Sequence, residues 1–446
     1  MPLRLQPPEL TSDYPRESTD SARSQTRLHR LMDWKLVRKI ARDVVRVERI
    51  DYGRCDVLTL AHDNDRHLLV DDKYYSPLVD TLEDRLRARG VRCLSIARII
   101  SSIKGDIAYG DVRSPEGAFA RALIGKRVKG AARRGVYPFS VMEERIWEKI
   151  LETTGAKRVI GIQPSRELCR AARRRGVWVA DLQHGVIAES HPWYGSRFRE
   201  REPSEFLPHA FVVWDPGSAE VLEWARASGS DVIVVGNPWI SRFITPHPED
   251  SLVRRLVEAA GGSFARNGKK NVLVSLSWGD TDIPNGVMTD ELATAIRASQ
   301  NEYNWFLRLH PNQLRGFASH EAAWFHKYYA EHLDGLATWK DATRQPLPLV
   351  LSQMDMHVTW NSSVCIEAAH FGLSSALLNH RMHSGGDKSD YYCYYKAVGR
   401  IDEVANTPES ILDWLKERGE SAARFDDYTS YDQSFEQLVM FLSDEK

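Results

Sequence analysis

Residues 178–193 bring several side chains that can exchange protons into one short stretch of the chain. An apolar strand is predicted over 177–180, and Asp181 and His184 follow it before Gly185. Polar groups just after a strand of an open α/β sheet lie where ligands bind. His184 can titrate near neutral pH, and the missing side chain of Gly185 would let a substrate approach closely. The stretch predicts a catalytic histidine; the alternative is a histidine that only hydrogen-bonds a neighbouring loop.

Acidic residues on two predicted loops are further candidates for this chemistry. Asp181, three residues before His184, could orient the imidazole or act itself as base or nucleophile, and Glu189 is a more distant candidate. Asp63 and Asp65 belong to an Asp-Asn-Asp sequence that follows the first predicted strand. Deprotonation of a hydroxyl, or covalent trapping of a sugar, requires such a group within hydrogen-bond reach of the reacting atoms.

A second set of polar residues follows strands predicted in the C-terminal half. Ser362 and Ser363 stand between a strand and a helix, where hydroxyls and free backbone N–H groups favour an anion. Glu367, one turn further on, could reach sugar hydroxyls. His310 and Pro311 end another strand of the same predicted sheet, so they are expected at the same edge. The alternatives are ordinary helix capping by one serine and a solvated surface acid.

The elements that must position these residues alternate between strand and helix, which predicts parallel sheets. We expect a loosely ordered tail over 1–30 and a doubly wound N-terminal domain over 31–240. A second doubly wound domain is expected over 241–425, with Ser277 and Trp278 near the end of its first strand. Two such sheets joined by a short linker predict a deep interdomain cleft. The segment 426–446 is expected to be helical and to pack back on the N-terminal domain.

Composition narrows the classes of function. The 446 residues are 42% hydrophobic and 27% charged with a formal net charge of −1, which argues against a dedicated nucleic-acid binder. Five scattered cysteines without a CxxC pair predict neither a disulfide framework nor a zinc site. No apolar run reaches the length of a membrane span and no signal peptide is recognised, so we expect a cytoplasmic protein.

One basic stretch, Gly117–Arg134, mixes apolar residues with Lys and Arg. Such a stretch can lie on an anionic membrane surface or receive an acidic substrate. It would then place the protein at the inner face of the membrane. The alternative, which we favour, is a helix whose apolar side packs on the sheet.

Three short motifs make the pattern more specific. Gln183-His184-Gly185, Arg308–Pro311 and Asn361–Val364 resemble, in this order, motifs of bacterial GT-B enzymes that build capsule and cell-wall polymers. These enzymes are the capsular Kdo transferases, the sialyl- and polysialyltransferases and the CDP-glycerol glycerophosphotransferases. The resemblance implies the GT-B fold, in which two Rossmann-like domains with doubly wound parallel sheets face each other across a cleft.

The resemblance also implies roles for residues. His310, Ser362 and Ser363 would hold the donor phosphate, and Glu367 would contact the ribose. The His184-Gly185 element would face them from the N-terminal domain. This sequence departs from the pattern, because the acidic pair with Gly of the sialyltransferases has no clear equivalent.

The implied function is a metal-independent glycosyltransferase without a further cofactor. It would move a sugar from a nucleotide donor, with CMP-Kdo or CMP-sialic acid favoured over a UDP-sugar, to a surface glycan or lipid-linked glycan. Transfer of a polyol phosphate from a CDP-linked donor and epimerisation of a UDP-sugar are alternatives. A non-catalytic assembly protein with the same fold is another, since fold analogy does not settle function.

Overall fold

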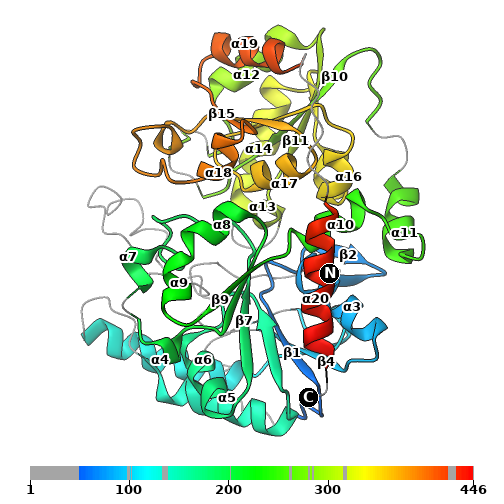
Figure 1. Cartoon of the computed structure of the whole chain (residues 1–446). Coiled ribbons are helices and arrows are strands. Elements are labelled where there is room, and N and C mark those ends of the chain that lie inside the picture. Colours follow the sequence, from blue (N-terminus) through cyan, green and yellow to red (C-terminus); the bar gives the residue numbers. More distant parts are fainter. Residues whose placement is uncertain are drawn as a thin grey trace.

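The computed structural model shows two α/β domains, one above the other in Figure 1. It describes residues 50–97, 101, 103–132, 139–200, 202–260, 264–279, 282–283, 286–314, 319–419 and 428–444. The tail predicted over residues 1–30 lies outside this range.

The lower domain in Figure 1 contains a parallel sheet. Among the described residues, seven strands pair in the order β5-β4-β1-β6-β7-β8-β9. The strands are β1 (Val57–Ala61), β4 (Cys93–Ala97), β5 (Val112–Arg113), β6 (Arg158–Gly161), β7 (Trp178–Leu182), β8 (Ala210–Val213) and β9 (Asp231–Val234). The helices are α3 (Val79–Ala88), α4 (Glu116–Ala132), α5 (Val141–Thr154), α6 (Arg166–Arg174), α7 (Ser196–Arg199), α8 (Pro216–Val221) and α9 (Glu223–Ala227). A small antiparallel hairpin, β2 (Leu68–Val70) and β3 (Lys73–Tyr75), was not expected from the sequence.

The upper domain contains a second parallel sheet. In the described part of the chain its six strands pair in the order β12-β11-β10-β13-β14-β15. They are β10 (Lys270–Ser275), β11 (Tyr303–Arg308), β12 (Ala337–Thr338), β13 (Met356–Thr359), β14 (Ser374–Leu377) and β15 (Ile401–Glu403). The helices are α12 (Asp290–Ser299), α13 (Pro311–Leu314), α14 (Ser319–His332), α15 (Lys340–Arg344), α16 (Leu347–Leu351), α17 (Val364–His370), α18 (Cys393–Ala397) and α19 (Pro408–Gly419). Strand order reverses between β10 and β13, as it does between β1 and β6 in the lower sheet, and ligands bind at such switch points.

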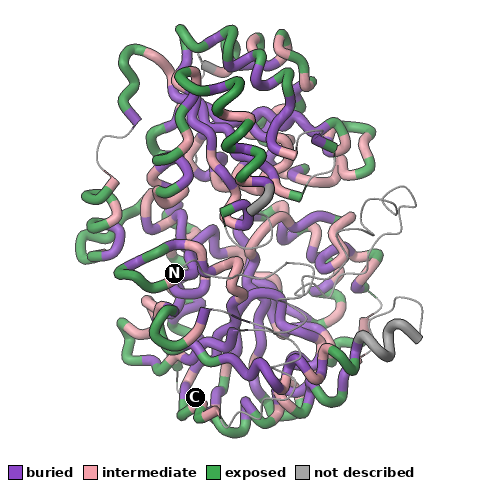
Figure 2. The backbone as a smooth tube through the Cα atoms, turned by 180° about the vertical axis from the view of Figure 1, so that it is seen from behind, coloured by how far each residue is buried: buried purple, intermediate pink, exposed green. Residues whose placement is uncertain are grey.

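Both sheets have apolar layers on their two sides. In β1, Leu58 and Leu60 belong to one buried cluster, whereas Val57 and Ala61 belong to another on the opposite side. This division follows from the two-residue period of a strand. The strands lie in the buried interior of each domain (Figure 2). The prediction of two doubly wound parallel-sheet domains is thereby confirmed.

The chain passes between the domains twice. Helices α10 (Pro238–Ile244) and α11 (Ser251–Ala260) lead from the lower domain to the upper one. The last helix, α20 (Thr429–Ser443), lies along the lower domain, where it contacts α3 (Figure 1). Four apolar residues of α20 belong to the buried cluster on one side of the lower sheet: Phe435, Leu438, Val439 and Leu442. The lower domain is therefore built from two separate parts of the sequence.

The strand that precedes His184 is longer than predicted. We expected it to end at Ala180, but β7 continues through Leu182 because Asp181 and Leu182 pair with Phe211 and Val212 of β8. This extension carries Asp181 into the sheet instead of the loop.

The basic stretch forms part of α4 and packs partly into the lower domain. Phe119 lies against Trp147, with ring centroids 5.0 Å apart. Lys126 is buried, and its ammonium group lies 2.7 Å from Glu143 and 2.9 Å from Glu167. The side chains of residues 127–134 lie outside the described set. Membrane contact through this stretch stays a prediction.

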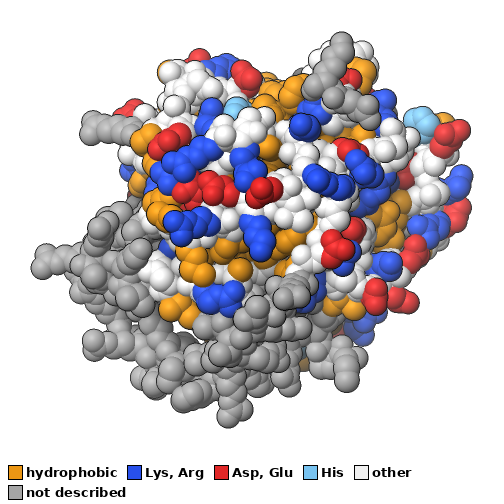
Figure 3. All heavy atoms as spheres, turned by 90° about the horizontal axis from the view of Figure 1, so that it is seen from below, with side chains coloured by type: hydrophobic (Ala, Val, Ile, Leu, Met, Phe, Trp, Pro, Cys, Tyr) orange, Lys and Arg blue, Asp and Glu red, His pale blue; other side chains and the backbone are white. Residues whose placement is uncertain are grey.

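Charges of both signs alternate on the underside of the lower domain. Figure 3 shows Lys and Arg side chains among Asp and Glu there, with hydrophobic side chains between them. Two ion pairs join the end of α6 to α5: Arg174 lies 3.1 Å from Glu144, and Arg175, just after α6, lies 3.2 Å from Glu152. In the described part of the chain, no helix has the length and apolar character needed to cross a bilayer.

Candidate functional site

A cleft of about 420 Å³ lies between the two domains. Its lower wall comes from residues that follow β1, β7, β8 and β9: Asn64, Asp65, His67, His184, Trp214 and Asn237, together with Ser76 and Trp239. Its upper wall comes from residues at or after the ends of β10, β11 and β13: Ser275, Trp278, Arg308, His310, Pro311, Ser362, Ser363 and Glu367. The strand ends of both sheets therefore converge on one space, as the sequence predicted.

His184 lines the lower wall as a neutral imidazole. Burial lowers the pKa of His184 to about 4, so the ring is uncharged at neutral pH and able to accept a proton. Its Nδ1 atom is buried and has no hydrogen-bond partner among the described residues. The side chain as a whole is half-buried.

Gln183 holds the turn that carries His184. Its side-chain amide donates to the carbonyl oxygen of Gly185 at 2.9 Å and to the hydroxyl of Ser218 at 3.2 Å. Its carbonyl oxygen accepts the backbone N–H of Trp214 at 2.7 Å. Gln183 is 1% exposed, so it supports the cleft from behind. Gly185 is not among the lining residues, although a Cβ added there would meet no atom within 4 Å.

The structure does not bring Asp181 or Glu189 into the cleft. Asp181 is 2% exposed, and its two carboxylate oxygens accept the backbone N–H of Gln163 and the indole N–H of Trp193, both at 2.9 Å. Its expected position beside His184 was wrong because β7 extends past it. Glu189 is exposed and accepts hydrogen bonds from the backbone N–H and the hydroxyl of Ser196, at 2.9 and 2.8 Å.

His310 offers a neutral hydrogen-bond donor to the upper wall. Burial and the nearby Arg308 lower the pKa of His310 to about 3. Its Nδ1 accepts the backbone N–H of Asn312 at 3.1 Å, so the neutral ring carries its proton on Nε2. The ring lies against Trp278, with centroids 5.5 Å apart. Pro311 lines the cleft beside His310. Ser277 does not line it, and the carbonyl oxygen of Ser277 accepts a hydrogen bond from the side-chain amide of Gln313 at 3.1 Å.

The two serines before α17 have different roles. The hydroxyl of Ser362 accepts the backbone N–H of Val364 at 3.3 Å, which is the ordinary capping predicted as the alternative. The hydroxyl of Ser363 makes no hydrogen bond to any described residue, so it is available to a ligand. Thr359 fixes this turn, because its Oγ1 accepts from Ser362 N–H at 3.1 Å and donates to the Ser275 carbonyl at 2.7 Å.

Glu367 titrates near neutral pH. Burial raises the pKa of Glu367 to about 7, and the positive charge of Arg308 only partly offsets that effect. Arg308 is held by the carbonyl oxygens of Ala342 and Gln345, the latter at 2.9 Å. Burial lowers the pKa of Arg308 to about 10, and it stays charged at neutral pH.

The Asp-Asn-Asp loop after β1 divides between the cleft and the interior. Asp65 lines the cleft, and its Oδ2 accepts the backbone N–H of His62 at 2.9 Å. Asp63 is not among the lining residues and accepts a hydrogen bond from the hydroxyl of Ser101. The predicted pair therefore supplies one carboxylate to the cleft.

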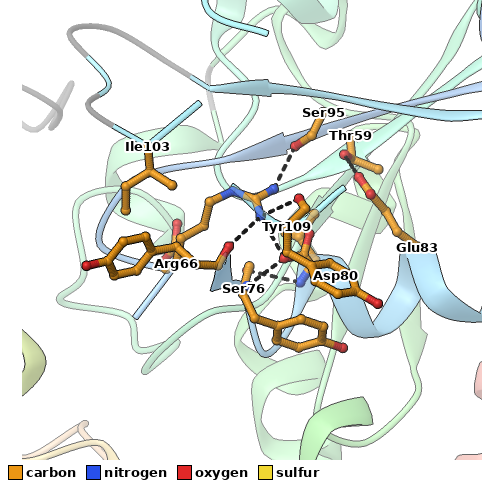
Figure 4. A network of polar contacts seen from close by, with 12 residues as sticks. Thr59, Arg66, Ser76, Asp80, Glu83, Ser95, Ile103 and Tyr109 are labelled. Carbon is orange, nitrogen blue, oxygen red and sulfur yellow. Dashed lines mark hydrogen bonds and ion pairs between the residues drawn. The ribbon is translucent and has the colours of Figure 1, made fainter. Parts of the chain in front are cut away.

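A buried ion pair holds this loop in place (Figure 4). Arg66 lies 2.6 Å from Asp80 of α3 and donates to the hydroxyl of Ser95 at 3.1 Å. The same Asp80 oxygen accepts the backbone N–H of Ser76, another cleft residue, at 2.7 Å. Arg66 and Asp80 are 1% and 0% exposed, so the network fixes the lower wall from inside the domain.

Sequence reasoning missed several lining residues. Trp214 directly follows β8 and Asn237 is the third residue after β9, so the rule that selected His184 could have selected them. Arg344, at the end of α15, lines the upper wall; its guanidinium is exposed and has no ion pair with any described residue. No sequence signal marks it, because α15 lies in a region without a recognised motif. Within the described residues, no group of three or more His, Cys, Asp or Glu could hold a metal ion.

Comparison with known proteins places the fold. No protein-family model and no curated protein matches the chain. A UDP-GlcNAc 2-epimerase from Neisseria meningitidis bound to UDP-GlcNAc has a similar structure, with a TM-score of 0.55 and 13% identity over 86% of this chain and 99% of that chain. The wall teichoic acid polymerase TagF matches with a TM-score of 0.52 and 12% identity over 95% and 98% of the two chains. A UDP-N-acetylglucosamine 2-epimerase from Rickettsia bellii matches with a TM-score of 0.52 and 10% identity over 87% and 96%.

These similarities confirm the predicted GT-B architecture. They extend over both domains of the chain, and each parallel sheet has the strand order expected of a doubly wound domain. At identities of 10–13% they concern the fold, and function must be argued from the cleft itself.

Proposed function

We propose that the protein is an enzyme that transfers a sugar from a nucleotide donor to a hydroxyl acceptor. The favoured donor is a CMP-sugar such as CMP-Kdo or CMP-sialic acid, and the proposed acceptor is a surface or lipid-linked glycan. One observation carries the proposal: His184 lines one wall of the cleft as a neutral base, while His310 and Ser363 line the opposite wall as free donors.

Each of these groups has a distinct task in the proposed reaction. The Nε2–H of His310 and the hydroxyl of Ser363 donate to oxygens of the nucleotide phosphate, and Glu367 accepts from ribose hydroxyls. His184 takes the proton of the acceptor hydroxyl while the oxygen of that hydroxyl attacks the anomeric carbon of the sugar. The bond from that carbon to the phosphate oxygen breaks, and its electron pair stays on the departing nucleotide.

A second candidate is chemistry on a diphosphate donor, either transfer of a CDP-linked polyol phosphate or epimerisation of a UDP-sugar. The resemblance of the fold to TagF and to UDP-GlcNAc 2-epimerases favours it. The exposed guanidinium of Arg344 also suits a second phosphate, because arginine binds phosphate through paired N–H groups. The products discriminate: sugar transfer and polyol-phosphate transfer both release CMP, but only the second adds a phosphodiester to the acceptor, whereas epimerisation changes only the sugar.

The first test is a panel of CMP, CDP, UDP and GDP measured by thermal shift. A ligand that binds the native state raises Tm, and saturation at 100 times Kd adds about 2.7 kcal/mol of stability. Ser363→Ala and His310→Ala should weaken binding roughly 10- to 150-fold, since a hydrogen bond to a charged group is worth about 1.5–3 kcal/mol.

Ser352→Ala is the matched control, because Ser352 is exposed and its hydroxyl bonds the Leu349 carbonyl oxygen at 2.9 Å and the Gln353 amide at 3.4 Å, both outside the cleft. Unaltered affinity in both site variants would remove the donor assignment. Binding without turnover of any CMP-, CDP- or UDP-linked donor would favour the non-catalytic assembly protein. We also propose that no metal takes part, so EDTA should leave turnover unchanged.

A further inference from the structure

The segment Asp390–Tyr395 of the upper domain reaches across to the lower domain. The carboxylate of Asp390 accepts two hydrogen bonds from Ser190, one from its backbone N–H at 2.6 Å and one from its hydroxyl at 2.8 Å. Ser190 lies six residues after His184, in the loop that leaves the cleft. Both partners are half-buried, so solvent only partly screens this contact.

The same segment packs on the lower domain through its tyrosines. A Cβ added to Gly217 would lie 2.2 Å from Cβ of Tyr394, so only a glycine leaves room for the Tyr394 side chain there. Tyr395 shares a buried apolar cluster with Trp214 of the cleft wall. Helix α18, which contains both tyrosines, contacts α8 where the domains meet (Figure 1).

The segment also touches the serine motif of its own domain. The hydroxyl of Tyr392 donates to the carbonyl oxygen of Asn361 at 3.0 Å, directly before Ser362. Tyr392 is 4% exposed and adopts a φ of 63°, which a bulky residue holds only when its surroundings fix it. One short segment thus contacts both the turn before Ser363 and the loop after His184.

Hydrogen bonds within the loop between His184 and Ser196 join its residues, so a change at Ser190 affects the whole loop. His191 N–H donates to the Ala188 carbonyl at 3.0 Å, and Gly195 N–H donates to the His191 carbonyl at 2.8 Å. Trp193 anchors the loop through its indole bond to Asp181. A displacement of Ser190 will therefore move a bonded turn and not a single side chain.

We propose that Asp390 is a positioning residue that holds the His184 loop from the opposite domain. Because Tyr392 of the same segment bonds Asn361, the position of this loop is linked to that of the turn with Ser362 and Ser363. An effect of Asp390 on turnover rests on the proposed function; its hold on the His184 loop does not.

Hydrogen–deuterium exchange of peptides covering 184–196 tests the proposal directly. In Asp390→Ala without ligand, exchange of these peptides should accelerate at least about tenfold relative to wild type, because both bonds to Ser190 are lost. Asp390→Asn keeps one acceptor oxygen and should restore part of the protection. Asp387→Ala is the matched control: Asp387 is exposed, lies in the same loop and bonds Arg381 of its own domain at 3.0 Å.

Turnover and binding supply the second readout. In Asp390→Ala, kcat should fall about 10- to 100-fold, while Kd for the best nucleotide of the panel stays within about threefold of wild type. Nucleotide should slow exchange of 184–196 in wild type and Asp387→Ala but not in Asp390→Ala. Equal exchange in Asp390→Ala and Asp387→Ala would overturn the proposal. If no nucleotide binds, the proposed function fails, and ligand-free exchange still decides whether Asp390 holds the loop.

Discussion

At the scale of single residues, the cleft combines groups whose protonation is set by burial. His184 and His310 are both neutral at physiological pH, yet their tasks differ. His310 has its Nδ1 engaged by Asn312 and can only donate, whereas His184 has no such engagement and can accept a proton. Glu367 completes the set as a carboxyl group that ionises near neutral pH.

The catalytic role of His184 predicts a specific pattern of loss. His184→Ala should keep its Tm and nucleotide affinity while turnover falls by about 10²–10⁴, the usual range for general acid–base catalysis. Because burial lowers the pKa of His184 to about 4, kcat of wild type at saturating donor, which does not depend on donor affinity, should decline on the acid side only below about pH 5. His247→Ala, at an exposed histidine, is the control. An acid limb near pH 6.5 would contradict the assignment.

Glu367 predicts pH-dependent donor binding. Its pKa of about 7 means that the carboxyl group is mostly protonated at pH 6 and mostly ionised at pH 8. Ribose hydroxyls donate more strongly to the ionised form, so nucleotide affinity should rise over this interval. Titration calorimetry of wild type and Glu367→Gln isolates the effect, because titration of the phosphate is common to both proteins. Parallel pH profiles would exclude Glu367 from the ribose site.

At the scale of elements, the sequence predicted the longer strands well, but it did not predict the short edge strands β5, β12 and β15, and it placed strand ends less well. Buried parallel strands are continuous apolar runs, so β1, β6 and β8 could be recognised without any partner. The end of β7 depends on pairing with β8, which the local sequence does not reveal, and Asp181 was therefore misplaced. The Ser190–Asp390 contact joins residues 200 positions apart and has no local signal at all.

Helix α20 predicts a strong effect of truncation. Its four buried side chains, at about 1.5–3 kcal/mol each, contribute about 6–12 kcal/mol, comparable with the whole stability of a domain. Ending the chain before Thr429 should therefore unfold the lower domain and leave the upper sheet folded. Limited proteolysis should then degrade residues 50–240 first. Replacement of the exposed Met440 by Ser is the control, and it should leave proteolysis unchanged.

At the scale of the whole molecule, buried histidines predict an acid-sensitive fold. Burial lowers the pKa of His357 and His370 to about 3, below the value of about 6.5 in an unfolded chain. The unfolded state therefore binds more protons between these values. The contribution of each histidine to stability is complete above pH 6.5 and is lost as pH falls toward 3.

Denaturant unfolding between pH 4.5 and 6.5 measures this effect. Each histidine should add a slope of up to about 1.4 kcal/mol per pH unit, with stability rising as pH rises. His357→Gln should reduce the slope. In wild type the Nδ1 atom of His357 lies 2.9 Å from the hydroxyl of Ser375, and the side-chain amide of the glutamine can still bond that hydroxyl. Replacement of the exposed His247 is the control. An unchanged slope in His357→Gln would show that the ring is not kept neutral by burial.

The return of α20 to the lower domain has a consequence for biosynthesis. A ribosome completes the described strands of the lower sheet by residue 234, but the helix that covers part of that sheet is made only after the upper domain. Domains generally fold in the order of their synthesis, and here the first domain lacks a piece of its core until α20 has been synthesised. Apolar residues such as Leu82 and Leu86 would meanwhile remain partly uncovered on the nascent chain. The upper domain, whose strands and α19 precede α20, can therefore finish folding before the lower one does.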